Sequence, residues 1–329
     1  MHTDLSTARV TRTIGTRVES TCTRITVDRA GQRPPRGVPL LAHRNRTPPP
    51  RCGALIGGGH VLLSEDDVAL FARVSGDRNA LHCSPAHARR TPFGRTVAHG
   101  VLAALATLDE QAADGSAPHP EGVSAVEADF GNPVFPGVPY RSEALGAARS
   151  GAGHRLRDGD RTCLTVRVRP GTPPALEPLP VPPAPAAHRH TVADLPPGTE
   201  VLGTYGPEGM DALRERFPAA ARMLGTTPLA CLLWASYVAG MRLPGENCLL
   251  GRVALRFHPV VAPGPVHLAY TARVVHADQR FGLVSLVGEI TADGAVVAEA
   301  EIEAMVRTPA PPADPAALRA HLSPSTRLA

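Results

Sequence analysis

VAHGVLAALATL, residues 97–108, is apolar on nearly every face, which is typical of a helix buried on all sides. VSAVEADFGNPVFPG (123–137) follows after a loop, and RTCLTVRVRP (161–170) alternates apolar and polar residues with a period of two. Such alternation is typical of half-buried strands. This order of signals predicts a β-sheet packed around one central helix.

The same order occurs a second time. PLACLLWASYVAG (228–240) is again apolar throughout, and it is followed by alternating stretches at 249–264, 267–277, 281–291 and 295–307. Phe130 stands six residues before Pro136, and Phe257 stands six residues before Pro263, so both pairs recur at an offset of 127 residues. A buried helix followed by several alternating strands, twice, indicates an internal repeat. Short turns between the later strands favour antiparallel pairing.

The chain has 329 residues, which is enough for about two domains. Its 35 prolines concentrate at 170–198, where neither a helix nor a central strand can run. We therefore predict a first unit at 1–169, a Pro-rich linker at 170–198, a second unit at 199–307 and a tail at 308–329. In the tail, Asp314-Pro315 predicts the start of one short helix.

Composition excludes several classes of protein. The chain has no lysine, so all 34 basic residues are arginine, and mechanisms that need a lysine amine are excluded. A net charge of +4 argues against a dedicated nucleic-acid binder. No apolar run is long enough to span a bilayer, and the N-terminus lacks the apolar region of a signal peptide. We expect a cytoplasmic protein that binds neither membranes nor nucleic acid.

Metal and cofactor motifs are also missing. The six cysteines are scattered without a C-x-x-C pair, which predicts free thiols rather than a zinc site or disulfides. His188 and His190 lie in the Pro-rich stretch without a third ligand nearby, and Gly57-Gly58-Gly59 lacks the full dinucleotide pattern. No G-x-S-x-G elbow is present, which disfavours a serine hydrolase. We expect no metal and no cofactor.

The segment before the first apolar helix holds the polar residues of interest. Ser64 to Asp67 reads as a capping box that begins a short amphipathic helix, and Gly76 fits its end. Asp77, Asn79 and His82 follow on a loop near the start of the apolar helix, so their side chains can converge on one pocket. Taken alone, an Asp and a His five residues apart fit a hydrogen bond that orders the loop just as well. A second such pair, at 114 and 119, receives no role.

These residues carry a family resemblance. FARVSGDRNALH (71–82), Ala88 and AHG (98–100) resemble the hydratase signature of the MaoC-like enzymes, which are (R)-specific enoyl-thioester hydratases and dehydratases with a hot-dog fold. With the repeat, the chain resembles a double hot-dog protein. The resemblance implies an α+β fold of two long antiparallel sheets, each wrapped around a central buried helix. Such enzymes serve fatty-acid and polyketide metabolism.

The resemblance also implies roles. Asp77 and His82 are expected to be the acid–base pair that interconverts 3-hydroxyacyl and 2-enoyl thioesters, bound to coenzyme A or to an acyl carrier protein. Asn79 is expected to orient the pair or the hydroxyl. Gly100 is expected to supply an N–H to the thioester oxygen, although tight packing of the helix on the sheet would also explain a glycine. Three arginines near the site fit either phosphate contacts or a solvated rim: Arg89, Arg90 and Arg95.

The second half has no matching pair. Thr204 and Gly209 stand 127 residues beyond Asp77 and His82, and Glu208 is the nearest carboxylate. We therefore expect one active site per chain, in a monomer that acts as a pseudo-dimer or in a homodimer. Two alternatives stay open: a hot-dog acyl thioesterase, and a non-catalytic subunit that binds acyl thioesters.

Overall fold

The computed structural model describes residues 59–113, 122–148, 151–184 and 186–307. All of these residues belong to one compact unit, Pro50–Ala329. The helix predicted after Asp314-Pro315 and the second Asp/His pair, at 114 and 119, lie outside the described residues.

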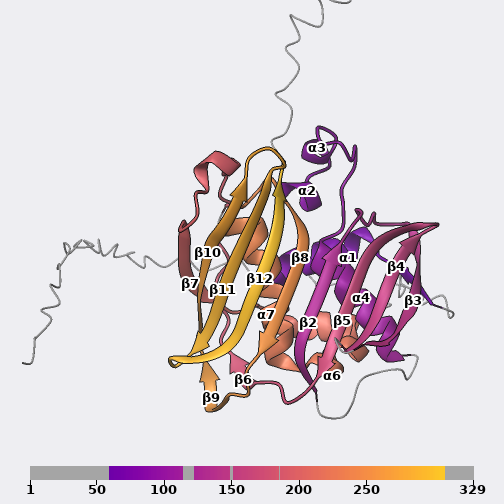
Figure 1. Cartoon of the computed structure of the whole chain (residues 1–329). Coiled ribbons are helices and arrows are strands. Elements are labelled where there is room, and N and C mark those ends of the chain that lie inside the picture. Colours follow the sequence, from indigo (N-terminus) through magenta and orange to yellow (C-terminus); the bar gives the residue numbers. More distant parts are fainter. Residues whose placement is uncertain (1–58, 114–121, 149–150, 185, 308–329) are drawn as a thin grey trace, which may run out of the picture. The chain divides into compact units, whose positions relative to one another are not determined.

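A ten-stranded sheet organises this unit (Figure 1). Every neighbouring pair of its strands runs antiparallel. The order across the sheet is β1 (His60–Leu62), β3 (Pro139–Ala148), β4 (Gly151–Asp158), β5 (Arg161–Pro170), β2 (Val123–Phe130), β8 (Cys248–Phe257), β12 (Ala295–Val306), β11 (Leu283–Ala292), β10 (Leu268–Asp278) and β7 (Glu200–Tyr205).

The strand order reads the same from either edge of the sheet. A short strand (β1 or β7) is followed by three consecutive strands, and the inner position belongs to the strand that follows a central helix (β2 or β8). The two inner strands pair with each other, with Ala125 opposite Arg256 and Asp129 opposite Arg252. Two five-stranded sheets therefore join edge to edge, which covers two edges that would otherwise be open. This is the double hot-dog architecture that the sequence predicts.

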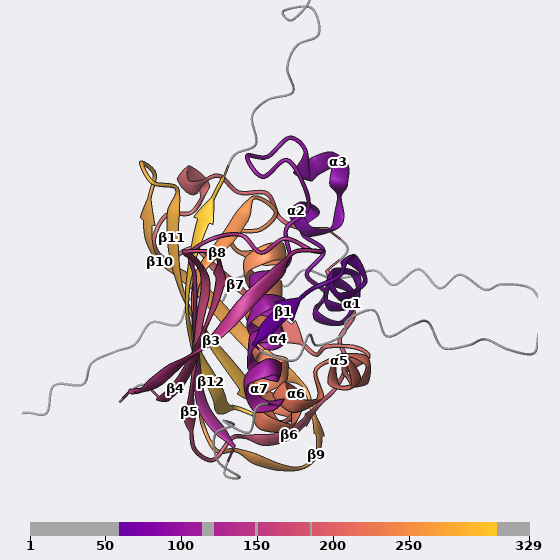
Figure 2. The ribbon, with the colours of Figure 1, turned by 90° about the vertical axis from the view of Figure 1, so that its right-hand side faces the viewer.

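The helices lie against one face of this sheet (Figure 2). Among the described residues, no single helix is long and apolar enough to cross a membrane. The helices Pro218–Leu224 and Thr226–Arg242, bent by 106° to each other, meet that criterion only as a pair. The helices are α1 (Glu65–Ser75), α2 (Ala80–Cys83), α3 (Pro85–Ala88), α4 (Gly100–Ala113), α5 (Met210–Arg216), α6 (Pro218–Leu224) and α7 (Thr226–Tyr237), which continues into a π-helical turn, η2 (Val238–Arg242).

The two central helices start at positions slightly different from those predicted. α4 begins at Gly100 rather than at Val97, and the Ala98 N–H before it donates to the Val134 carbonyl at 2.8 Å. α7 begins at Thr226, two residues before the predicted start, and Pro228 is tolerated there because the first turn of a helix needs no N–H partner.

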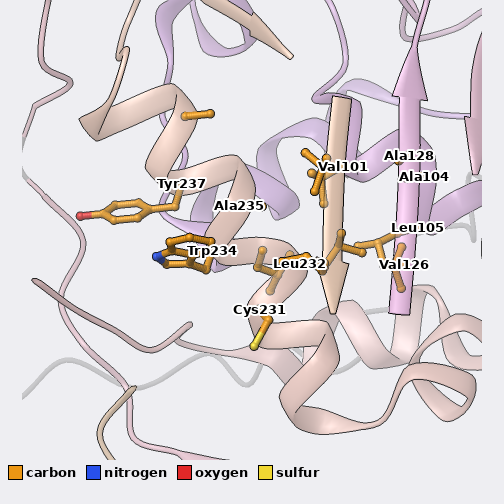
Figure 3. Close-up of a cluster of buried hydrophobic side chains, with 14 of the residues drawn as sticks. Val101, Ala104, Leu105, Val126, Ala128, Cys231, Leu232, Trp234, Ala235 and Tyr237 are labelled. Atoms are coloured by element: carbon orange, nitrogen blue, oxygen red, sulfur yellow. The ribbon is translucent and has the colours of Figure 1, made fainter. Parts of the chain in front are cut away.

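Both central helices belong to one hydrophobic core (Figure 3). Every residue of α7 from Thr227 to Tyr237 is buried, and Val101 and Leu105 of α4 are fully buried beside it. Trp234 fills the space between α7 and the sheet, where Gly288 of β11 leaves room for its ring. Each fully buried side chain of this size contributes roughly 1.5–3 kcal/mol, so the core fixes the two helices firmly.

The Pro-rich segment 170–198 is packed rather than free. Its described residues include a four-residue strand, β6 (Ala175–Pro178), and a 3₁₀ turn, η1 (Val192–Asp194). β6 pairs in parallel with β9 (Val261–Val266), apart from the main sheet. Leu176 and Leu195 are buried. Pro170 ends β5 of the main sheet, and the buried apolar residues of the segment join the core.

Candidate active site

The helix before the candidate residues forms as the sequence predicts. The Ser64 hydroxyl accepts a hydrogen bond from the Asp67 N–H at 3.1 Å, and the Asp67 carboxylate accepts one from the Ser64 N–H at 2.8 Å. α1 ends at Gly76, whose φ of 73° lies in the left-handed region that glycine adopts at low cost. This turn directs the chain, and Asp77 with it, back toward the core.

Asp77 is buried with both carboxylate oxygens bonded. One oxygen accepts a hydrogen bond from the Ser236 hydroxyl at 2.7 Å, and the other accepts one from the Asn79 N–H at 3.2 Å. Ser236 lies on α7, so the second half of the chain holds a group of the first half. A Cβ atom at Gly240 would overlap the same carboxylate, which makes a glycine necessary there.

Asn79 caps the next helix. Its side-chain oxygen accepts a hydrogen bond from the Leu81 N–H at 3.1 Å, at the N-terminus of α2. Its amide nitrogen is buried and has no partner within the described structure. Asn79 therefore orients Asp77 through its backbone N–H, and its side chain keeps one donor available at the cavity.

His82 lies on α2 with one ring nitrogen committed. Its Nδ1 donates to the Val97 carbonyl at 2.7 Å, so in the neutral ring Nε2 carries the lone pair. The ring lies against that of His99, with centroids 3.9 Å apart. His99, directly before α4, donates from Nε2 to the Asp77 carbonyl at 3.0 Å, while its Nδ1 is buried without a described partner.

Asp77, His82 and His99 form a tight cluster. One carboxylate oxygen and one nitrogen from each ring lie within 4.8 Å of one another, close enough that the three could hold a metal ion. Each histidine, however, uses one nitrogen to bind a backbone carbonyl. Those bonds orient the rings equally well for proton transfer.

Burial moves the pKa values of Asp77 and His82 toward each other. Desolvation raises the pKa of the Asp77 carboxyl above its ordinary value, against the opposing effects of His82 and the Ser236 bond. Desolvation lowers the pKa of the His82 ring below its ordinary value, and it lowers that of His99 further. Burial thus shifts each group toward its neutral form, and the two pKa values come closer together, which lowers the cost of passing a proton between them.

A cavity of about 250 Å³ contains these groups at the boundary between the two halves. The first half contributes Asp77, Asn79, His82 and Gly100, and the second half contributes Ser236 and Gly240, together with the ends of β8 and β12. The N–H groups of the first turn of α4 have no partners within that helix, and Gly100 brings them to the cavity. A Cβ at Gly100 would also press on the Phe130 ring at 3.0 Å, so tight packing by itself accounts for the glycine.

The three arginines near the site separate into different environments. Arg95 donates to the Pro136 carbonyl at 2.9 Å and stacks over the Phe135 ring at 4.5 Å, so it is used structurally. Arg89 is exposed and does not line the cavity that contains Asp77 and His82. Arg90 lines a second cavity that adjoins the first.

The second half lacks the segment that carries the candidate residues. In the first half, residues 76–99 separate α1 from α4, whereas in the second half only 217–225 separate α5 from α7. Thr204 lies in β7 and Gly209 caps α5, so both precede the helix that corresponds to α1. The constant offset of 127 therefore does not extend to this region, and neither residue is the structural counterpart of Asp77 or His82.

Sequence reasoning did not identify the roles of Ser236, Gly240 and His99. One signal was available: Ser236 and Gly240 interrupt an otherwise apolar helix without adding to its hydrophobic face, which could have indicated a polar neighbour there. Their partner, however, is more than 150 positions away in the chain, and no local pattern predicts that contact.

The fold and the site together define a hot-dog protein whose two halves enclose a buried aspartate–histidine pair. Residues 51–149 match the family model described as a MaoC like domain. The resemblance seen in residues 71–100 is thereby confirmed.

Two curated relatives match short regions. A 3-hydroxybutyryl-CoA dehydratase of Methylorubrum extorquens is 50% identical over 42 residues, which are 13% of this chain and 27% of the relative. A 3-hydroxyacyl-thioester dehydratase Z of Mycobacterium tuberculosis is 42% identical over 53 residues, which are 16% of this chain and 35% of the relative. The chain thus spans well under two thirds of either relative. A solved structure of a MaoC-like dehydratase aligns with a TM-score of 0.56 at 13% identity, covering 76% of this chain and 96% of that one, which supports the fold.

Proposed function

We propose that this protein is a hydro-lyase that interconverts 3-hydroxyacyl and 2-enoyl thioesters, with Asp77 and His82 as its acid–base pair. The observation that carries the proposal is the pair itself: two titratable groups, shifted in opposite directions by burial, in one cavity at the N-terminus of a buried helix. The names of the two dehydratase relatives support the same substrate class.

The pair suits both proton transfers of the reaction. In dehydration, one group takes the proton from the α-carbon, and the other gives its proton to the 3-hydroxyl as the carbon–oxygen bond breaks and water leaves. A neutral His82 offers the Nε2 lone pair as the base, and a protonated Asp77 offers the acid; the reverse reaction returns both protons. Asp77 and His82 thereby move the two protons by which one water molecule leaves the substrate or is added to it.

The thioester oxygen gains negative charge when the α-proton leaves. The free N–H groups at the start of α4 and the positive end of its helix dipole suit an oxygen bound beside Gly100. The unpartnered amide nitrogen of Asn79 is a further donor for the substrate hydroxyl.

The test measures hydration of crotonyl-CoA and release of free thiol in the same samples. We expect hydration without thiol release, and a loss of kcat of about 10²–10⁴ for Asp77→Asn and for His82→Gln. The double variant should lose little more than either single one, because both groups act on one water. Thr204→Ala, outside the cavity, is the control. Thiol release without hydration would favour the thioesterase, and neither activity with retained binding would favour the non-catalytic subunit.

A further inference from the structure

A second cavity, of about 430 Å³, adjoins the candidate active site. The two cavities share four lining residues: Phe93, Cys248, Leu249 and Arg307. Arg307 directly follows β12, and Met305, two residues earlier in that strand, lines the first cavity. Two residues of a strand span roughly 7 Å, so Arg307 stands at the outer end of the space that contains Asp77 and His82.

The second cavity is positively charged. Arg90, in the loop after α3, and Arg307 line it from opposite halves of the chain, together with His87. Its one acidic lining residue, Glu246, is already paired with Arg189. Within the described residues, neither Arg90 nor Arg307 has a carboxylate partner. Two exposed arginines without a carboxylate partner therefore line the same cavity.

The rest of the lining is suited to a slender, partly apolar arm. Leu81, Pro92, Phe93 and Leu249 give apolar walls, and Thr91 and Asn247 add polar atoms. Arginine binds phosphate through two parallel N–H bonds, which makes it well suited to hold the charged end of such an arm.

Resting on the proposed function, we propose that the second cavity receives the arm of the thioester, and that Arg90 and Arg307 bind the phosphate group at the far end of this arm. Both possible carriers of the acyl group, coenzyme A and the prosthetic group of a carrier protein, have a phosphate ester at that position. The three arginines near the site therefore differ: Arg90 binds phosphate, whereas Arg89 and Arg95 do not.

The test compares Arg90→Ala, Arg307→Ala and the double variant with Arg89→Ala, which removes the same charge from the adjacent exposed position. For each, kcat/KM is measured with crotonyl-CoA and with a crotonyl thioester of N-acetylcysteamine, which has no phosphate. We expect each Arg90 or Arg307 variant to lower the ratio of the two kcat/KM values about tenfold through KM, since hydrogen bonds to charged groups are worth roughly this much. Arg89→Ala should leave the ratio within about twofold.

A binding measurement separates this proposal from the proposed function. The dissociation constant of coenzyme A itself should rise about tenfold in the Arg90 and Arg307 variants, whether or not the protein hydrates crotonyl-CoA. If the wild type hydrates both thioesters but the variants keep the ratio and the dissociation constant, the phosphate site is overturned and the proposed function stands. Equal losses on both thioesters would overturn it too.

The source of the phosphate is distinguished by a third substrate, crotonyl-4′-phosphopantetheine. A loss equal to that for crotonyl-CoA assigns the contact to the phosphate that both carriers share. A loss for crotonyl-CoA alone assigns it to the phosphates of the nucleotide part, and coenzyme A is then the carrier that this cavity recognises.

Discussion

Asp77 receives its strongest hydrogen bond from the other half of the chain. The Ser236 hydroxyl lies 2.7 Å from the carboxylate, and this bond lowers the pKa of Asp77 while burial raises it more. Ser236 is therefore a positioning residue, because it acts on the reaction through Asp77.

Ser236→Ala should raise the pKa of Asp77 further and lower kcat about tenfold, because one carboxylate oxygen loses its donor. A pH–rate profile checks this: the limb that reports Asp77 should move to higher pH. Ser236→Thr, which keeps the hydroxyl, should restore the limb. Thr107→Val is a matched control, since that buried hydroxyl bonds only the Ala103 carbonyl within α4. An unmoved limb in Ser236→Ala would contradict the role.

His99 makes the folded state sensitive to acid. Burial holds the pKa of His99 well below 6.5, and burial also lowers that of His82, so the unfolded chain binds protons that the folded protein refuses. These two histidines therefore do not lower the free energy of unfolding well above pH 6.5, and they lower it increasingly as the pH drops below about 6.5.

His99→Gln should flatten this dependence between about pH 6.5 and pH 5, by roughly 1 kcal/mol, while its amide keeps a donor for the Asp77 carbonyl. Urea unfolding at several pH values measures the slope. A slope in His99→Gln identical to that of the wild type would contradict the low pKa of His99 in the folded protein.

At the scale of elements, α4 holds α6 in place by a charged cap. The Asp109 carboxylate accepts hydrogen bonds from the N–H groups of Ala219 and Ala220, at 2.7 and 2.9 Å. The cap satisfies donors that the first turn of α6 leaves free, and it joins the two halves away from the cavity.

Asp109→Ala should lower the free energy of unfolding by about 1–3 kcal/mol, because the part-buried N–H of Ala219 and the buried N–H of Ala220 lose their acceptor. Asp109→Asn should lose less, since its amide oxygen still accepts. Denaturant midpoints at constant slope give the values, and Asp211→Ala on the exposed side of α5 serves as control. KM for the thioester should not change, and a rise would mean that α6 also shapes the cavity.

Local features of the elements were predictable from the sequence, and long-range ones were not. The capping box at Ser64, the turn at Gly76 and the two apolar helices depend on neighbours within a few residues, and the structure has them all. The bond from Ser236 to Asp77 depends on how the halves join. The loop sequence also does not show that the Arg95 guanidinium is already engaged by stacking on the Phe135 ring.

At the scale of the whole molecule, the second half completes the site without repeating it. Its interior is filled: Trp234 and its neighbours are fully buried, and Gly288 has no room for a side chain beside that ring. The candidate cavity therefore lies at the joint of the halves, where β2 pairs with β8, rather than inside the second half. The second half supplies one wall of the cavity and the Ser236 hydroxyl that donates to Asp77. Its connection 217–225 is too short to hold a loop like 76–99.

One active site per chain follows from this asymmetry. Titration with a tight-binding, non-hydrolysable analogue of an enoyl thioester should saturate at one equivalent per chain in whatever oligomer the protein forms.

Thr204→Ala and Glu208→Ala should each keep kcat within about a factor of three, because both residues line a small hollow beside Tyr237 and not the candidate cavity. Gly240→Ala is the contrasting variant: the added methyl group meets the Asp77 carboxylate and should abolish most of the activity. Two equivalents bound per chain, or a collapse of activity in Thr204→Ala or Glu208→Ala, would show that the second half has a working site of its own.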